Sequence, residues 1–200
     1  TNGIPIPEGK EYAISLIDKN KIAQDMAALR PQCDYLVISL HWGTEYLLEP
    51  TQEQQELAQF VADQGADLIL GHHPHVLESA QWLTRADGGQ TFCIYSLGNF
   101  VSSQNTKETM LGGMLSLTVH RRTDGTVETL APGVLPIITH FENGGKNYRV
   151  YPLEDYTQDL IPRHAVKKYD SPITLDYYNG LAQQVLGEFL QTKESFACHP

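Results

Sequence analysis

The sequence predicts an α/β fold built around a parallel strand–helix–strand unit. Residues 34–40 form an apolar run that is typical of a strand buried on both faces. A helix is expected to begin at Thr51, and residues 67–70 form a second buried strand. Such a crossover is right-handed and places its two strands parallel in one sheet.

Helix signals flank the first of these strands. Residues 19–30 carry apolar side chains at helical spacing and stop before Pro31. In the second helix, Thr51 and Gln54 fit a capping box, and Gly65 fits the position after the last turn. The apolar stripe of this helix consists of Leu57, Phe60 and Val61.

The remaining elements follow in chain order. Residues 1–10 are rich in Pro and Gly and predict a loop, and residues 11–18 predict a short strand. Residues 91–97 predict a further strand. Residues 110–120 and 126–138 alternate as strands do and are separated by a turn signal, so they predict a hairpin.

The C-terminal part of the chain has a different texture. Pro136, late in the second hairpin strand, suggests that this strand lies at a sheet edge or is ending. Prolines punctuate the chain from Tyr151 onward, and residues 175–190 look like an amphipathic helix. We therefore expect one domain over residues 1–150 and a helical C-terminal extension over residues 151–200 that packs on it.

Composition restricts the partners of the chain. Its 200 residues suit one domain, or a domain with an extension, and a hydrophobic fraction of 41% is enough for a real core. The formal net charge is -10, and the Lys and Arg residues are scattered. Because nucleic acids and anionic lipids are bound by clusters of basic residues, both are poor prospects as partners.

Neither the cysteines nor the start of the chain defines a compartment. Cys33, Cys93 and Cys198 lie far apart and form no CxxC pair, which excludes a zinc ribbon or a thioredoxin-type motif. The first residues lack an initiator Met and resemble the middle of a chain, so we expect a fragment. The lack of a visible targeting or membrane segment then says little about location.

Histidines follow both strands of the predicted parallel unit. His41 comes directly after the first strand, and His72, His73 and His75 come directly after the second. The carboxyl ends of parallel strands lie at one edge of a sheet, and open α/β sheets bind ligands there. We therefore expect these histidines to converge, and imidazole suits zinc, iron and similar ions.

The loop after the second strand has the composition of a metal-binding turn. His73 and His75 are two residues apart, which points both side chains to the same side of an extended segment. Pro74 biases His73 toward an extended conformation. Gly71 allows the backbone to turn tightly at the strand end. His72 fits either a residue that supports the ligands or a spare.

Three further residues near this edge of the sheet each fit more than one role. Glu45 fits a proton carrier or a carboxylate that orients a ligand, and it equally fits a solvated loop residue. Asn99 follows a strand and Gly98, so it fits either the same site or a plain turn. Trp42 fits either the wall of a substrate cleft or a packed core. Of these, we assign Glu45 and Asn99 to the catalytic site.

Other catalytic patterns are absent from the sequence. It has no G-x-S-x-G elbow, no Walker loop and no G-x-G-x-x-G after a strand. The remaining histidines have no partners at ligand spacing, and we read them as structural or exposed: His120, His140, His164 and His199.

Residues 34–101 resemble the bacterial capsule synthesis family, of the CapA or poly-γ-glutamate synthesis type. The matching segments occur in the family's order and are together specific: Leu40-His41-Trp42-Gly43 with Glu45-Tyr46, Gly65-Ala66-Asp67, Gly71-His72-His73-Pro74-His75 and Tyr95-Ser96-Leu97-Gly98-Asn99-Phe100. Residues 1–30 and 110–155 are similar more loosely.

The resemblance implies a fold and a metal centre. The family is similar to calcineurin-like metallophosphoesterases, which implies an α/β/β/α sandwich, present here as its C-terminal half. It also implies a two-metal site of divalent ions (Mn, Fe or Zn), with His41, His73 and His75 as metal ligands. The N-terminal half of the family pattern is missing, so we expect weak or absent metal binding by this fragment alone.

Two functions stay open at this point. The first is a metal-dependent phosphoesterase-type hydrolase that acts on a cell-envelope polymer or a phosphoester in capsule metabolism. The second is a non-catalytic scaffold in a membrane polymer-synthesis complex, whose subunits would be its partners. A zinc hydrolase unrelated to capsule is a third reading. The resemblance implies an extracellular or cell-surface, membrane-anchored parent, and it implies no oligomeric state.

Overall fold

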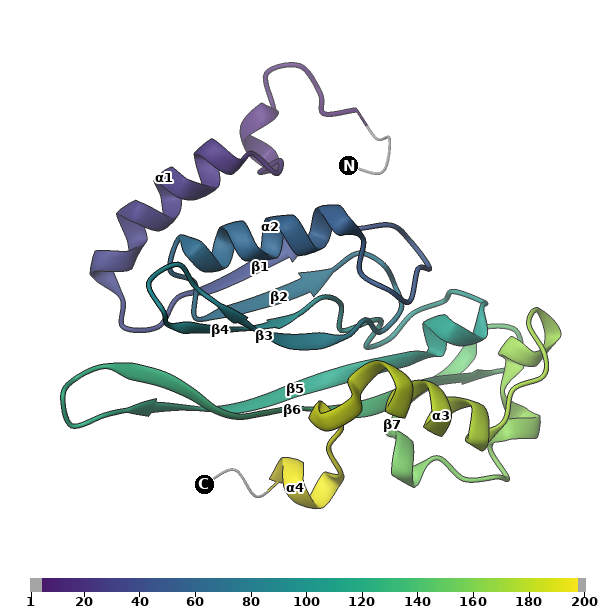
Figure 1. Ribbon diagram of the computed structural model, residues 1–200. Helices are drawn as coiled ribbons and strands as arrows, with labels where there is room; N and C mark the ends of the chain where they lie inside the picture. The colour runs from purple at the N-terminus through teal and green to yellow at the C-terminus, as the bar shows by residue number, and fades with distance from the viewer. Residues whose placement is uncertain (1–4, 198–200) are drawn as a thin grey trace.

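A computed structural model describes residues 5–197 and contains two sheets that lie one over the other (Figure 1). A mixed four-stranded sheet has the order β1-β2-β4-β3. Its strands are β1 (Val37–His41), β2 (Leu68–His72), β3 (Ala80–Thr84) and β4 (Gln90–Ile94). A three-stranded antiparallel sheet has the order β5-β6-β7, with β5 (Leu111–Arg121), β6 (Val127–Glu142) and β7 (Lys146–Pro152).

Helices cover the outer side of the first sheet and pack beside the second. The α-helices are α1 (Lys19–Leu29), α2 (Gln52–Asp63), α3 (Leu175–Leu186) and α4 (Lys193–Ala197). Short 3-10 helices occupy Glu11–Ala13, Arg30–Gln32, Lys107–Met110, Leu153–Asp155, Ile161–Arg163, Ala165–Lys168 and Gly187–Phe189. No helix in the described part of the chain is both long and apolar enough to span a bilayer.

The predicted strand–helix–strand unit is confirmed. β1 and β2 are parallel, with Cα partners running from Val37↔Leu68 to His41↔His72. The α2 helix between them begins with the predicted capping box, in which Thr51 and Gln54 satisfy each other's backbone N–H groups. Gly65 follows the helix with a φ of 92°, which suits a residue without a Cβ.

The expectation that the first strand is buried on both faces is wrong. Only Leu40 of β1 is buried, and Val37 is 44% exposed. Among residues 5–197, β1 pairs with β2 alone and forms the edge of the sheet, so one side of this apolar strand faces solvent. Apolar composition reports what a strand is suited to contact, whereas burial depends on which neighbours the structure supplies.

Residues 11–18 are not a strand. The structure has a 3-10 helix at Glu11–Ala13 followed by an irregular segment, in which Tyr12 is 82% exposed. A strand needs a neighbour for its backbone N–H and C=O groups, and no strand lies beside this segment in the described chain. The next prediction holds, because α1 begins after an Asp18 cap and ends before Pro31.

The long hairpin is confirmed, but the position of its second strand is not the predicted one. β6 is the central strand of its sheet, so Pro136 does not mark an edge strand. Pro136 lies opposite Gly113, whose N–H donates to Leu97 instead of β6. Opposite residues in antiparallel strands exchange either both hydrogen bonds or none, so the Pro136 nitrogen faces away from β5. It faces the β7 side, where pairing begins only at Ile137.

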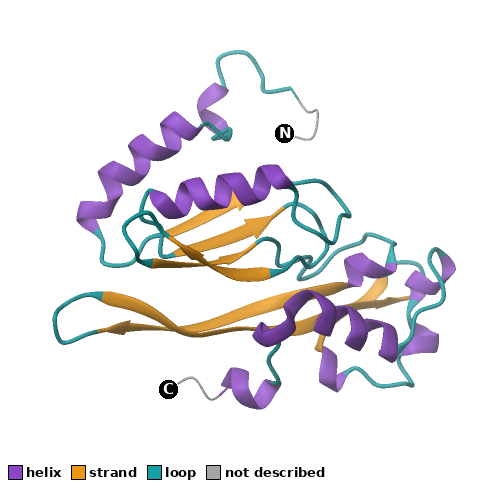
Figure 2. Cartoon of the chain, in the orientation of Figure 1, coloured by secondary structure: helices purple, strands orange, loops and turns teal. Residues whose placement is uncertain are grey.

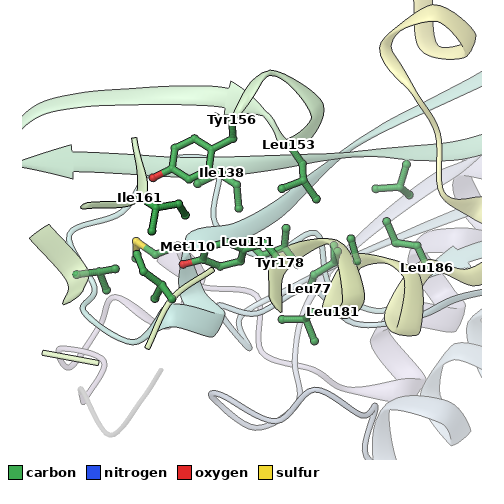
Figure 3. Packing of buried hydrophobic residues seen from close by; sticks show 14 of the residues in the cluster. Leu77, Met110, Leu111, Ile138, Leu153, Tyr156, Ile161, Tyr178, Leu181 and Leu186 are labelled. Atoms are coloured by element: carbon green, nitrogen blue, oxygen red, sulfur yellow. The ribbon is translucent and has the colours of Figure 1, made fainter. Parts of the chain in front are cut away.

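Two hydrophobic clusters hold the layers together. One lies between α2 and the first sheet and includes Met26, Trp42, Val61, Ile69 and Tyr95. The larger one joins residues of both sheets to the C-terminal segment (Figure 3). In that cluster Leu77, Met110, Leu111, Ile138, Tyr178 and Leu186 are all nearly or fully buried. Residues between 151 and 190 therefore contribute to the main core as well as covering it.

The cysteines and the chain end need only brief description. Cys93 is buried in β4, where burial raises the pKa of its thiol, and Cys33 is partly exposed. Cys198 and His199 lie outside the described residues.

Candidate functional site

The two predicted histidine positions meet at one end of the first sheet. His41 and His72 are the last residues of β1 and β2 and are direct Cα partners. The Trp42 backbone N–H donates to the His72 carbonyl over 3.0 Å, which extends the contact beyond the strands. Figure 2 shows the loops that leave these strands at the same end of the sheet. The predicted convergence is confirmed, although His41 and His72 both lie inside their strands instead of following them.

His41 and His73 form the closest pair. Their ring centroids are 4.6 Å apart, whereas those of His73 and His75 are 6.3 Å apart. The Nδ1 atom of His73 is buried and has no hydrogen-bond partner in the described chain. A buried polar atom without a partner is unfavourable by about 1–3 kcal/mol, so this nitrogen is expected to meet an ion, a water molecule or a substrate atom.

The loop that carries the histidines is strained. His73 and His75 have φ angles of 107° and 63°, in the region that side chains with a Cβ rarely adopt. The expected extended conformation of His73 is therefore wrong. Tyr46, with a φ of 68°, donates its N–H to the Pro74 carbonyl over 2.8 Å, so a second loop holds this one in place. Strain of this kind gathers at functional sites, where surrounding contacts over-determine the backbone.

Gly71 has a different role from the one predicted. It lies within β2 and has no positive φ, so it does not make a tight turn. A Cβ at this position would lie 1.8 Å from the Tyr95 carbonyl oxygen and 2.6 Å from Trp42 Nε1. Gly71 is needed because its backbone packs directly against the Tyr95 backbone, just after β4, and against the Trp42 ring.

Asn99 orients His75. Its Oδ1 lies 3.0 Å from His75 Nδ1, and its Nδ2 lies 3.1 Å from the His75 carbonyl oxygen. The same Nδ2 also approaches Gln104 Oε1 and the Thr109 carbonyl. These three acceptors require the amide nitrogen on that side, so Oδ1 accepts and His75 Nδ1 carries the proton. His75 Nε2 is then left with a free lone pair, which is the form that binds a metal or accepts a proton.

His72 and His73 are held toward the neutral imidazole form, because the pKa of each is lowered. Burial lowers the pKa of His72, and the adjacent His41 lowers it further. Burial followed by the proximity of His41 also lowers the pKa of His73. A neutral imidazole ring retains the lone pair that metal binding requires. The surroundings of His72 and His73 therefore favour rings that can bind a metal over protonated, positively charged rings.

Of the residues that follow His41, Glu45 and Tyr46 lie near the other histidines, whereas Trp42 packs in the core. Glu45 is half-buried, and its charge acts on His73 and on Tyr46. Burial raises the pKa of the Tyr46 phenol, and Glu45 raises it further. Tyr46 also stacks on the His75 ring at 6.2 Å. Trp42 is 4% exposed, stacks on Tyr95 and donates Nε1–H to the Tyr95 carbonyl, so it belongs mainly to the core.

A cleft of about 480 Å³ opens beside the His41–His73 pair. It is lined by Ile17, Lys19, His41, Trp42, Gly43, Gln54, Leu57 and His73, together with two glutamates of α2. A larger hollow of about 770 Å³ lies elsewhere and contains Arg85 and Arg122. Both guanidinium groups there are already paired with carboxylates. The smaller cleft is therefore the better candidate for a substrate.

The histidines fit part of a metal ligand set. Within residues 5–197, no three His, Cys, Asp or Glu side chains are grouped closely enough to hold an ion. The unpaired His73 Nδ1 and the neutral state of that ring suit a ligand, and His41 faces it. A catalytic zinc site uses three protein ligands, so this pair supplies fewer than one ion needs. The roles of His41, His73 and His75 as metal ligands stay a prediction.

Sequence reasoning missed a buried network under the site. Glu78 is fully buried, and its Oε2 accepts from Gln54 Nε2 over 2.8 Å. The Gln54 side chain also packs against Gly43, where a Cβ would come within 2.6 Å of it. Burial raises the pKa of Glu78 to about 7, while Gln54 opposes that rise. The capping box marked Gln54 for its backbone role, but no local signal revealed its contact with Glu78.

The remaining histidines that the structure describes, His120, His140 and His164, are structural or exposed, as predicted. His120 lies on the outer part of β5, where it pairs with Glu128. His140 and His164 are both 1% exposed, and their ring centroids are 4.8 Å apart although the residues are distant in sequence.

Comparison with known proteins matches this site to a family. Residues 2–104, which include the histidine loop and Asn99, match the family model described as bacterial capsule synthesis protein PGA_cap. The chain is 36% identical over 135 residues to the PGA biosynthesis protein CapA of Bacillus subtilis (strain 168), which covers 68% of this chain and 30% of that protein. It is 41% identical over 93 residues to the capsule biosynthesis protein CapA of Bacillus anthracis, which covers 46% of this chain and 21% of that protein.

These similarities cover the elements that build the site. The family match extends over β1, α2, β2, β3 and β4 and ends in the loop after Asn99. The matched segment spans less than a third of the length of either relative. Because the family model matches more than half of the 200 residues, the chain belongs to the bacterial capsule synthesis family PGA_cap.

Proposed function

We propose that this chain supplies the histidine side of a metal-dependent, phosphoesterase-type hydrolase centre that acts in capsule polymer metabolism. The observation that carries the proposal is the strained loop that brings His73 to His41 while leaving His73 Nδ1 buried and unpaired. Two relatives are named for capsule or PGA biosynthesis, which supports a substrate from poly-γ-glutamate metabolism that carries a phosphoester bond.

The proposed fold is half of a metallophosphoesterase sandwich. Two stacked sheets, with α2 outside the first and α3 beside the second, are consistent with such layers (Figure 1). The exposed β1 edge is where further strands of that sandwich would pair.

In this centre His41, His73 and His75 would hold divalent ions such as Mn, Fe or Zn. Bound ions would supply an acidic water and stabilise charge on the leaving oxygen. The chain's own residues set the ligand geometry: Asn99 keeps the proton on His75 Nδ1 and so presents Nε2. Glu45, whose charge acts on His73, would accept or donate a proton at the edge of the loop.

A non-catalytic scaffold is the second candidate. The observation in its favour is that residues 5–197 contain no group of three possible metal ligands. In that case the strained loop would be a binding surface for subunits of a membrane polymer synthase. For either function, the family resemblance implies that the full-length protein is membrane-anchored and lies at the cell surface.

Two histidine variants, His73→Ala and His120→Ala, distinguish the hydrolase from the scaffold. Metal content and hydrolysis of a phosphodiester such as bis-p-nitrophenyl phosphate are measured for the longest available form of the protein, for His73→Ala, and for the matched control His120→Ala. We expect His73→Ala to lower kcat/KM by more than about 100-fold, beyond the range for residues that only orient ligands. His120→Ala should leave activity unchanged, because His120 lies on the far hairpin.

Two outcomes would overturn the hydrolase. Equal activity of the wild type and His73→Ala would remove the loop from catalysis. Full inactivity of the wild type with metal present, combined with retained binding to synthase subunits, would favour the scaffold. The 200-residue chain alone is expected to bind Mn²⁺ or Zn²⁺ weakly in calorimetry, and two tightly bound ions would contradict the view that its ligand set is partial.

A further inference from the structure

A second cavity lies on the antiparallel sheet, away from the histidine loop. It has a volume of about 180 Å³, below the roughly 300 Å³ at which pockets for drug-sized molecules begin. Every side chain that lines it is polar: His140, Glu142, Asn147, Arg149, Tyr151 and Arg163. A space this small and this polar suits the charged end of a larger molecule that extends into solvent.

A bulge between β6 and β7 brings these side chains to one face. His140 lies directly opposite Arg149, and Glu142 lies opposite Lys146, with an irregularity in the register between the two pairs. Asn147 adopts a φ of 55° inside this irregular stretch. Directly opposite residues share a face of the sheet, and bulges re-aim side chains beside sites. Arg163 reaches the same space from the 3-10 helix at Ile161–Arg163.

The groups around the cavity leave one positive charge without a partner. Glu142 Oε1 lies 2.6 Å from Arg163 Nη2 and 3.3 Å from His140 Nε2, so this carboxylate is already engaged. Arg149 pairs with β6 through its backbone, but its side chain forms no hydrogen bond or ion pair within the described chain. Its guanidinium nevertheless lies close enough to act on His140. Two guanidinium groups thus face a single carboxylate, in a chain whose net charge is -10.

His140 lines the buried side of the cavity and is held in place by a hydrogen bond. The His140 side chain is 2% exposed, and its Nδ1 lies 2.7 Å from the Tyr156 hydroxyl. Burial lowers the pKa of His140, while Glu142 opposes that change. His140 is therefore neutral near pH 7 and contributes shape and hydrogen bonding, while the positive charge comes from the arginines.

We propose that this cavity binds one carboxylate group, of the kind that each unit of a γ-linked glutamate polymer presents. The planar guanidinium fork of Arg149 matches a carboxylate with two parallel hydrogen bonds. A single negative charge balances the single excess positive charge, whereas a phosphate dianion would add repulsion from Glu142. The polymer as the source of the carboxylate rests on the proposed function.

The test is calorimetric titration of a γ-linked glutamate decamer at low salt, with EDTA present so that no metal site contributes. We expect Arg149→Gln to weaken binding by about tenfold, the scale of one charge-assisted hydrogen bond. Arg149→Lys should weaken it as well, because the charge stays but the fork is lost. The matched control Arg122→Gln removes an exposed arginine from the far hairpin and should change affinity less than twofold.

Competition identifies the ligand chemistry. Free glutamate should displace the decamer at lower concentration than inorganic phosphate does, and the reverse order would overturn the carboxylate assignment. Equal affinities for the wild type and Arg149→Gln, an equal loss in Arg122→Gln, or no decamer binding at all would each overturn the site. Since the Arg149 side chain has no hydrogen-bond or ion-pair partner among residues 5–197, circular dichroism should show both variants at this position to be folded.

The carboxylate site and the proposed hydrolase can be overturned separately. Binding that depends on Arg149, without any phosphodiesterase activity, would overturn the hydrolase and leave the carboxylate site. Activity that depends on His73, without any Arg149-dependent binding, would do the opposite.

Discussion

Asn99 shows how one side chain can determine the state of a catalytic candidate. All of its polar atoms are directed at protein groups, namely the ring and carbonyl of His75, Gln104 and Thr109. It therefore acts as a positioning residue for His75, and its own amide is not presented to a substrate. The strained φ of His75 persists because this amide holds both ends of the residue.

Replacement of Asn99 by Ala is expected to lower the free energy of unfolding by about 1–3 kcal/mol, because buried acceptors lose their donor. The His75 ring should also lose its single tautomer. Urea denaturation measures the first effect, and nitrogen-15 NMR of the imidazole measures the second. The exposed Asn105→Ala is the matched control. A His75 tautomer that is unchanged in Asn99→Ala would contradict the assigned proton position.

A single residue, Glu78, is expected to make the stability of the fold depend on pH. Its side chain is fully buried, one carboxylate oxygen has no partner in the described chain, and burial raises its pKa to about 7. The folded state therefore holds the proton more tightly than the unfolded state, whose value is near 4.5. Stability from this group is fully present below about pH 4.5 and is lost as pH rises to about 7.

Glu78→Gln keeps the acceptor for Gln54 and removes the buried charge. It should raise the melting temperature above pH 7, by an amount equivalent to roughly 3 kcal/mol at most, and have little effect at pH 4.5. Thermal melts from pH 4.5 to 8.5 measure this, with the exposed Glu188→Gln as control. A difference between Glu78→Gln and the wild type that does not vary with pH would show that Glu78 titrates normally.

At the scale of elements, Asp67 joins four segments at the start of β2. Its carboxylate accepts from Arg30 Nη1 at 2.5 Å, Arg85 Nη1 at 3.2 Å and the Leu36 N–H at 2.7 Å. These donors come from the end of α1, the β3–β4 turn and the residue before β1. The network lies at the opposite ends of the strands from the histidines, so it aligns β1 with β2 and thereby His41 with His72.

Asp67→Asn is expected to lower the free energy of unfolding by about 3 kcal/mol, because it leaves arginines partly buried without their charge partner. Asp34→Asn breaks an ion pair with Arg121 in which both side chains are more than half exposed, and it should change stability by less than about 1 kcal/mol. Urea denaturation of both variants measures the contrast. Equal effects would mean that the Asp67 network is as solvated as the surface pair.

Prediction of the elements succeeded where the signal was local. The capping box at Thr51, the Asp18-to-Pro31 helix and the long hairpin depend on neighbours in sequence, and all three are present. The strands β3 and β7 were missed, because each is short and is stabilised by pairing with a strand already formed. The predicted strand at 11–18 failed for the converse reason, since it has no partner strand in the described chain.

At the scale of the whole molecule, the C-terminal segment is part of the core. Tyr178 and Leu186 of α3 belong to the same buried cluster as Leu77, which follows β2 (Figure 3). That cluster also includes Ile94 of the first sheet and Val134 of the second. The boundary predicted at residue 150 marks a change in sequence pattern. The buried cluster nevertheless contains residues from both sides of that boundary. A single cluster that joins both sheets and α3 predicts cooperative unfolding.

Leu186→Ala is expected to lower the free energy of unfolding by about 2–5 kcal/mol, the range for truncation of a buried leucine. The midpoint should shift equally by circular dichroism and by tryptophan fluorescence, although Trp42 and Trp82 both lie in the first sheet and its loops. The exposed-surface control is Gln184→Ala. A fluorescence midpoint that stays in place while the dichroism midpoint shifts would show that the two parts unfold separately.

The sequence by itself determined the parallel unit, the capping of α2 and the placing of histidines at both strand ends. These follow from periodicity, local hydrogen bonding and the fixed handedness of crossovers, which act over short distances along the chain. Only the tertiary structure decided that β1 is an exposed edge, that Gly71 serves a close approach instead of a turn, and that His73 adopts a left-handed backbone. It alone joined Asn99 to His75, Gln54 to Glu78 and Arg149 to the polar cavity, because contacts between distant residues depend on how the layers pack.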